Sequence, residues 1–123
     1  MTLKEFIHNI PDFPKPGIIF KDISPLLRNP EATRETVLQL AKGLDTKKID
    51  QVVGIESRGF LLGILLAQHL QVGFTLMRKP GKLPGRVIKQ SYALEYGEDA
   101  IEIQENAIKP GQKVILHDDV LAT

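Results

Sequence analysis

The spacing of apolar residues changes near residue 51 and divides the chain into two kinds of pattern. Before that point, apolar residues recur every three or four positions, which predicts an amphipathic helix. These residues are Val37, Leu40, Ala41 and Leu44. Asn29 followed by Pro30 predicts the start of this helix, because Asn caps helices and Pro fits the first helical position.

The first thirty residues contain turn signals and short elements. Thr2 and Glu5 have the spacing of a capping box and predict a short helix at the start of the chain. Residues 11–17 contain three prolines and a glycine, so no regular helix can continue there. Residues 18–20 form a short apolar run that we expect to be extended. Ser24 before Pro25 resembles a second helix start.

After residue 51, apolar runs are short and mostly uninterrupted. Residues 52–55 and 73–77 predict buried strands, and residues 60–70 are apolar nearly all round, which predicts a buried helix between them. A strand, a helix and a strand in this space form a βαβ unit. The pattern therefore predicts an α/β fold with a parallel sheet.

The last part of the chain predicts a hairpin and one more strand. Residues 87–96 and 100–104 form two strand-like runs around a turn at 97–99. Within the second run, Ile101 and Ile103 alternate with Glu102 and Gln104, so we expect the face with Glu102 and Gln104 to meet water. Residues 113–117 predict a further strand. A parallel strand normally returns through a helix, so we expect either an edge strand or, preferably, a piece of a longer chain.

Length and charge exclude several classes of protein. The chain has 123 residues, which predicts one domain over 1–123, and a net charge of +1 from 16 basic and 15 acidic residues. This balance disfavours a nucleic-acid-binding arm. The absence of Cys excludes disulfides and thiolate chemistry, and the three His residues lack metal-ligand spacing. Without a 20-residue apolar run or a signal peptide pattern, we expect a cytoplasmic protein that binds no membrane.

Two segments have the chemistry of anion binding. Glu56, Ser57 and Arg58 lie where a predicted strand turns into a helix, so backbone N–H groups and a guanidinium converge on a phosphate-sized site. The alternative is a surface turn in which Arg58 pairs with Glu56 or with solvent. Residues 78–86 hold four basic side chains among Gly and Pro, which suits a mobile loop that closes over a polyanion. Its alternative is a solvated charged loop.

Three carboxylates complete the candidate chemistry. Asp118 and Asp119 follow an apolar strand, where ligands of parallel sheets bind, and can accept hydrogen bonds from a diol or help to hold a divalent ion. Their alternative role is helix capping. Glu95, near the hairpin turn, is a candidate acid or base, or else a solvated strand residue. His117 lies in a strand, and we expect it to be packed.

Five ordered segments resemble the adenine phosphoribosyltransferases, a family of type I phosphoribosyltransferases. The resemblance rests on residues 12–27, 56–61, 78–85, 92–97 and 114–123. It implies a Rossmann-like parallel sheet with helices on both faces and a hairpin loop. The C-terminal part of this fold is missing from the sequence. It also implies a base-binding N-terminal segment over 1–30 and a partial core over 50–123.

The resemblance implies an enzyme of purine salvage. The family converts adenine and 5-phosphoribosyl 1-diphosphate to AMP and pyrophosphate with Mg2+, which the substrate diphosphate carries without direct protein ligands. It also implies a homodimer, with no nucleic acid as partner. The implied base-binding residues are Ile19, Phe20 and Lys21. The implied diphosphate contacts are Glu56, Ser57, Arg58, Arg78, Lys79, Lys82 and Tyr96. The implied ribose and 5′-phosphate contacts are Asp118, Asp119, Ala122 and Thr123.

The resemblance further implies that Glu95 exchanges a proton with the purine nitrogen, and that a cis peptide bond joins Glu56 to Ser57. Two departures stand out. His117 replaces a usually aliphatic residue, and the family pattern continues beyond Thr123 with two glycines and a hydroxyl residue. We therefore expect the 123 residues alone to be poorly active. The alternatives are a phosphoribosyltransferase for a 6-oxopurine, a non-catalytic nucleic-acid-binding relative, and a fragment that only dimerises.

Overall fold

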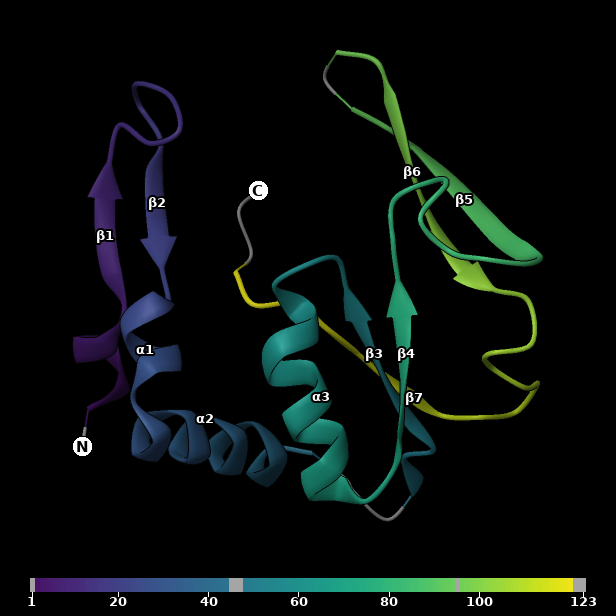
Figure 1. Cartoon of the computed structure of the whole chain (residues 1–123), viewed down its shortest axis with the longest axis horizontal. Coiled ribbons are helices and arrows are strands. Elements are labelled where there is room, and N and C mark those ends of the chain that lie inside the picture. Colours follow the sequence, from purple (N-terminus) through teal and green to yellow (C-terminus); the bar gives the residue numbers. More distant parts are fainter. Residues whose placement is uncertain (1, 45–47, 95, 121–123) are drawn as a thin grey trace. The chain divides into compact units, whose positions relative to one another are not determined.

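The computed structural model describes residues 2–44, 48–94 and 96–120 (Figure 1). The chain forms two compact units, Met1–Leu44 and Asp45–Thr123, and each is described by itself. Within the described ranges, no helix is both long and apolar enough to cross a membrane.

The first unit begins with a 3-10 helix, η1 (Leu3–Phe6), followed by two antiparallel strands, β1 (His8–Pro11) and β2 (Ile19–Asp22). The short initial helix is confirmed, although Thr2 makes no side-chain cap. The sequence analysis missed β1. This strand is stabilised by its register with β2, a contact between residues about ten positions apart that the local pattern does not show.

Two helices complete the first unit: α1 (Ser24–Arg28) and α2 (Pro30–Lys42). The predicted cap of α2 is confirmed, because Asn29 Oδ1 accepts a hydrogen bond of 3.0 Å from the Ala32 N–H. The predicted cap of α1 is wrong. Ser24 is the first helical residue, and its N–H instead donates to Asp22 Oδ1 at 2.9 Å.

The second unit is built on a parallel sheet with strand order β4–β3–β7. The strands are β3 (Gln51–Ile55), β4 (Gly73–Met77) and β7 (Val114–His117), and all pair in parallel. The predicted βαβ unit is therefore confirmed. Since parallel strands end at one edge, the loops that follow them are brought together there.

Helix α3 (Gly59–Leu70) connects β3 to β4 and packs against both strands. The packing is close at Gly63, where an added Cβ would lie 2.8 Å from the Phe74 ring and 3.4 Å from His117 Cδ2. His117 is buried, as predicted. The prediction that α3 is buried all round is wrong, because the outer positions face solvent. These positions are Leu61, Ile64 and Leu65.

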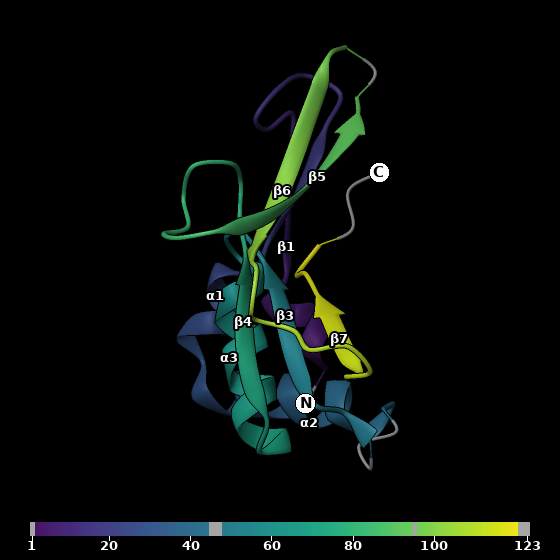
Figure 2. The same cartoon turned by 90° about the vertical axis from the view of Figure 1, so that its right-hand side faces the viewer.

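A hairpin of β5 (Val87–Ala93) and β6 (Glu98–Gln104) extends beyond the carboxyl end of β4 (Figures 1 and 2). The hairpin was predicted, and Gln104 of β6 is exposed to water as expected, but the same prediction for Glu102 is wrong. Glu102 is buried. Its backbone pairs with that of Arg78, and its side chain accepts a hydrogen bond from the Gly81 N–H, so loop contacts cover this face.

The contact at Gly63 generates a stability prediction. Replacement of Gly63 by Val should lower the free energy of unfolding by about 1–3 kcal/mol, because the new methyl groups overlap the Phe74 ring. Urea denaturation measures the change. Gly73→Ala is the control, since an added Cβ there meets nothing within 4 Å. Equal stability of both variants would contradict this description of the packing.

His117 generates a pH prediction. Burial lowers the pKa of this imidazole, against the opposing effect of the Asp118 and Asp119 carboxylates. The unfolded chain therefore takes up a proton more readily, with a pKa of about 6.5. The free energy of unfolding should fall as the pH drops below that value, until the lowered native pKa is passed.

His117→Leu should remove this part of the pH dependence, because Leu cannot be protonated. Urea denaturation at several pH values between 7.5 and 5 measures the slope. His69→Gln, an exposed position on α3, is the control and should keep the wild-type slope. An unchanged slope in His117→Leu would contradict the prediction.

Candidate active site

Polar residues follow each of the three parallel strands at the carboxyl edge of the sheet. Ser57 and Arg58 lie in the turn after β3, Arg78 follows β4, and Asp118 and Asp119 follow β7. The strands end on the same side, toward the hairpin, as Figure 1 shows. These five residues therefore share one edge of the sheet.

Arg58 and Asp119 form an ion pair across this edge. Arg58 Nε lies 3.0 Å from Asp119 Oδ2, and the Arg58 side chain is 41% exposed while that of Asp119 is only 3% exposed. Among the described residues, no group donates a well-aligned hydrogen bond to Asp119 Oδ2. The alternative in which Arg58 pairs with Glu56 is not what the structure shows. The guanidinium instead connects the turn after β3 to the end of β7.

Gly59 permits this close approach. An added Cβ at Gly59 would lie 2.9 Å from His117 O and 3.2 Å from Asp118 Oδ1. Any larger side chain would therefore separate the start of α3 from the end of β7. The predicted cis peptide bond between Glu56 and Ser57 is confirmed. The start of α3 also directs its positive end to this edge, which suits an anion.

The two carboxylates after β7 differ in their surroundings. Partial burial raises the pKa of Asp118, although a hydrogen bond of 2.8 Å from the Asp119 N–H opposes the shift. Asp119 Oδ1 accepts a similar bond from the Val120 N–H. Each carboxylate thus fixes the backbone that follows it, and Asp118 is the more exposed of the two. The alternative of helix capping is not tested, because Val120 alone follows Asp119 within the described residues.

Arg78 joins three parts of the second unit. Its Nε donates to Glu56 Oε1 at 2.7 Å, and its guanidinium carbon lies 5.9 Å from the centre of the Phe60 ring. Its backbone N–H and carbonyl both pair with Glu102 of β6, at 2.9 and 2.7 Å. The Arg78 hydrogen bond lowers the pKa of Glu56, against partial desolvation. Glu56 therefore acts as the anchor of Arg78.

The basic loop after β4 is held by the hairpin. Glu102 Oε1 accepts a hydrogen bond of 3.0 Å from the Gly81 N–H, where Gly81 has a φ of +83° that favours glycine. Lys79 Nζ forms an ion pair with Asp99 Oδ2 and lies 3.4 Å from the Tyr92 hydroxyl. The alternative of a freely solvated loop therefore does not apply to Lys79 and Gly81.

The sequence analysis did not predict that Asp99 and Glu102 hold the basic loop. Both lie on β6, about twenty residues from their partners. The only signal in the sequence was the acidic character of β6 beside a basic loop. That signal did not specify the register that brings the two segments together.

Three of the expected residues lie outside the described residues: Glu95, Ala122 and Thr123. Tyr96 lies at the hairpin turn and is 88% exposed. Lys82 is close enough to Glu56 for its charge to favour the ionised carboxylate, together with the Arg78 contacts. The roles expected for these residues stay predictions.

The expected base-binding residues belong to the first unit. Ile19 is 62% exposed, and Lys21 Nζ donates to Asn9 Oδ1 at 2.6 Å. The Phe13 ring meets the Phe20 ring edge-on, with centroids 5.1 Å apart. The two rings are thus in edge contact, and Ile19 offers apolar surface to solvent.

The donor set suits a metal ion that arrives with its ligand. Among the described residues, no group of three or more His, Asp or Glu side chains could hold a metal ion. Asp118 and Asp119 supply hard oxygen atoms. Mg2+ is typically bound by one or two carboxylates together with substrate phosphates. The residues present therefore fit Mg2+ carried by a diphosphate.

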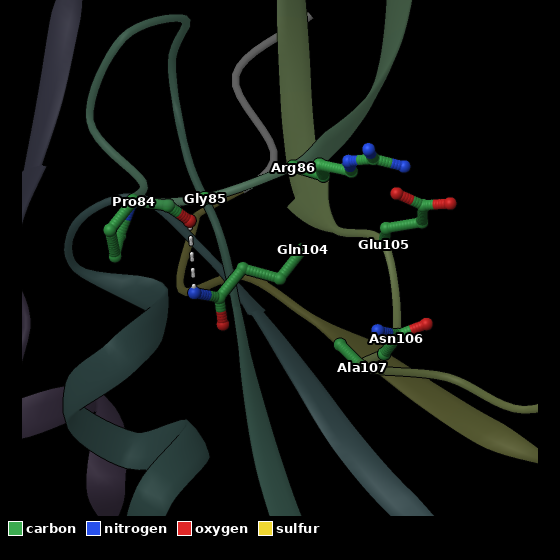
Figure 3. Close-up of a pocket in the computed structure, with 7 residues that line it drawn as sticks. All are labelled: Pro84, Gly85, Arg86, Gln104, Glu105, Asn106 and Ala107. Carbon is green, nitrogen blue, oxygen red and sulfur yellow. Dashed lines mark hydrogen bonds between the residues drawn. The ribbon is translucent and has the colours of Figure 1, made fainter.

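A separate hollow of about 440 Å³ lies at the base of the hairpin (Figure 3). The Gln104 amide donates across it to the Pro84 carbonyl at 3.3 Å. None of the expected site residues lines this hollow. Its lining consists of Pro84, Gly85, Arg86, Gln104, Glu105, Asn106 and Ala107.

Comparisons with known proteins agree with this geometry. Residues 24–123 match the model of the phosphoribosyl transferase domain. An adenine phosphoribosyltransferase of Christiangramia forsetii is 58% identical over 123 residues, which are 100% of this chain and 72% of the relative.

Two solved structures are similar over nearly the whole chain. The adenine phosphoribosyltransferase of Rhodothermus marinus has a TM-score of 0.90 and 52% identity, over 97% of this chain and 68% of its own. The enzyme of Saccharomyces cerevisiae, complexed with adenine and an imino-altritol bisphosphate, has a TM-score of 0.85 and 47% identity, over 93% and 67%. The fold, the shared carboxyl edge and these identities together show that the chain belongs to the adenine phosphoribosyltransferase family.

Proposed function

We propose that this chain transfers a 5-phosphoribosyl group from 5-phosphoribosyl 1-diphosphate to adenine, giving AMP and pyrophosphate in purine salvage. The observation that carries the proposal is the Arg58–Asp119 ion pair at the carboxyl edge of the sheet. It joins a cation suited to a diphosphate and a carboxylate suited to ribose hydroxyl groups. Membership of the adenine phosphoribosyltransferase family supports the same activity.

In this proposal, the diphosphate binds at the turn after β3 and at the basic loop. Ser57 and Arg58 contact it at the positive end of α3. Arg78, Lys79 and Lys82 add cations from the loop, and Glu56 fixes Arg78 through their hydrogen bond of 2.7 Å. Tyr96 is proposed as a further contact from the hairpin turn.

The ribose and its 5′-phosphate bind at the end of β7. Asp118 and Asp119 accept hydrogen bonds from the two ribose hydroxyl groups, and Ala122 and Thr123 belong to the cradle of the 5′-phosphate. Arg58 orients the Asp119 carboxylate, since their side chains are in contact. The sugar is therefore held between the residues that bind its diphosphate and those that bind its hydroxyl groups.

Adenine is proposed to bind at the first unit. The Phe20 ring stacks on the purine, and backbone groups of Ile19 and Lys21 hydrogen-bond to its edge. The exposed apolar surface of Ile19 supports this role, because purine sites are flat and apolar with few polar groups. The similar Saccharomyces cerevisiae enzyme is complexed with adenine.

The reaction breaks the bond between ribose C1 and the diphosphate oxygen and forms a bond from C1 to a purine nitrogen. Positive charge develops on the sugar while negative charge develops on the leaving pyrophosphate. Arg58 and the basic loop neutralise the leaving group. Glu95 takes the proton that the purine nitrogen loses, and returns it in the reverse reaction. Closure of residues 79–96 excludes water, which would hydrolyse the activated sugar.

Mg2+, when bound with the diphosphate, supplies further neutralisation of its oxygen atoms. In this proposal the ion is held by the diphosphate, and Asp118 and Asp119 contact the sugar that carries it. A homodimer and a cytoplasmic location are proposed from the family resemblance alone.

The activity is tested with radiolabelled bases. In the presence of 5-phosphoribosyl 1-diphosphate and Mg2+, the chain should convert adenine to AMP and should leave guanine and hypoxanthine unchanged. Chromatography of the nucleotides measures the products. Conversion of guanine or hypoxanthine in preference to adenine would assign a 6-oxopurine enzyme, and absence of any nucleotide would contradict the proposed function.

The rate of this chain is compared with that of the longer Rhodothermus marinus enzyme under the same conditions. We expect a markedly lower rate, because the family pattern places further phosphate-binding glycines beyond Thr123. Comparable rates would contradict the expectation of poor activity and leave the proposed reaction intact.

Arg58→Gln should lower kcat/KM for 5-phosphoribosyl 1-diphosphate by about 100-fold, because the variant loses a cation that stabilises the leaving pyrophosphate. Steady-state AMP formation measures the change. Arg34→Gln is the matched control, since Arg34 is exposed on α2 and belongs to none of the proposed contacts. An equal loss in both variants would indicate a general effect of charge and contradict the role of Arg58.

A further inference from the structure

Lys79, which the proposed function assigns to the diphosphate, already contacts a carboxylate of the hairpin. Its ammonium forms an ion pair with Asp99 and lies 3.4 Å from the Tyr92 hydroxyl and 6.0 Å from the centre of the Tyr92 ring. Asp99 and Tyr92 are register partners in β6 and β5. Both strands of the hairpin therefore hold the same lysine.

The ion pair is ionised and accessible to water. The hydrogen bond with Asp99 raises the pKa of Lys79, and the same bond lowers the pKa of Asp99. The side chains are 45% and 30% exposed, respectively. An ion pair with this exposure contributes little net stability, so a ligand with several anionic oxygens can replace the carboxylate.

Glu102, the other carboxylate of β6 that contacts the loop, cannot be replaced by a ligand in this way. Glu102 is buried and accepts its hydrogen bond from the backbone N–H of Gly81. A ligand can replace the Asp99 carboxylate at the Lys79 ammonium without changing the main-chain path. Replacement of the Glu102 carboxylate at the Gly81 N–H would instead break the turn. Of these two acids, Asp99 alone holds a group that is also suited to bind a phosphate.

We propose that Asp99 is a built-in competitor of the diphosphate group for the Lys79 ammonium. Its carboxylate oxygen neutralises Lys79 until a phosphate oxygen takes that place. Asp99 thereby limits how tightly the diphosphate of the substrate and the free pyrophosphate product are held. The inference rests on the proposed function, because that function brings a diphosphate to Lys79.

Weaker binding of the diphosphate has a benefit in catalysis. A contact that holds the substrate and the product equally well does not accelerate the chemical step. It does slow the departure of the product, and product release limits many enzymes. When Lys79 moves to the diphosphate, the loop loses its contact with Asp99 but keeps its hydrogen bonds to Glu102, so its main-chain path is retained.

The experiment measures the binding of inorganic pyrophosphate, in the presence of Mg2+, by isothermal titration calorimetry. Asp99→Asn should lower the dissociation constant by about twofold to fivefold, which corresponds to removal of an exposed ion pair. Asp99→Glu keeps the carboxylate and should bind as the wild type does. Lys79→Gln should weaken binding, and Lys79→Gln with Asp99→Asn should match Lys79→Gln alone.

Glu98→Gln is the matched control. Glu98 precedes Asp99 in β6, so its side chain points to the opposite face of the strand, and the substitution makes the same change in net charge. Its dissociation constant should stay within about 1.5-fold of the wild type, as expected for an exposed charge without a specific partner.

Weaker pyrophosphate binding by Asp99→Asn would overturn the inference, because Asp99 would then support Lys79. An equal gain in Glu98→Gln, or a gain that persists without Lys79, would also overturn it. So would a wild-type chain that does not bind pyrophosphate. The adenine assay reports on the proposed function separately. If AMP forms but Asp99→Asn leaves the dissociation constant for pyrophosphate unchanged, this inference alone is rejected. If the variants bind pyrophosphate as expected but no AMP forms, the proposed function alone is rejected.

Discussion

The site depends on the close approach between the start of α3 and the end of β7. The contact is made at Gly59, where a side chain would meet the His117 carbonyl oxygen and the Asp118 carboxylate. With no side chain there, the backbone turn after β3 reaches the carboxylates after β7, and Arg58 completes the connection to Asp119. The ends of β3 and β7, which are adjacent in the sheet but distant in sequence, are thus brought together.

The basic loop has a different kind of support. Acids in other segments make three of its polar contacts: Glu56 binds Arg78, Asp99 binds Lys79, and Glu102 binds the Gly81 N–H. A loop of four like charges would otherwise repel itself and stay extended. The acids remove part of this repulsion, and each leaves the loop with a defined shape before any anion arrives.

Local patterns in the sequence were sufficient for much of the second unit. The βαβ unit, the hairpin and the cap at Asn29 depend on residues close in sequence, and these were predicted. The strand β1 and the burial of Glu102 were not, because both depend on partners that only the folded backbone supplies. The exposed outer positions of α3 were also missed, since an apolar sequence does not reveal what covers it.

In the site, too, contacts between segments that are distant in sequence were not predicted. The residue types after each strand indicated anion binding, and the family resemblance indicated the cis peptide bond between Glu56 and Ser57. The pairing of Arg58 with Asp119 instead of Glu56 depends on the order of strands in the sheet. The backbone contact between Arg78 and Glu102 also has a consequence for mutational tolerance. Because main-chain atoms make this contact, the two hydrogen bonds do not themselves select the side chain at either position.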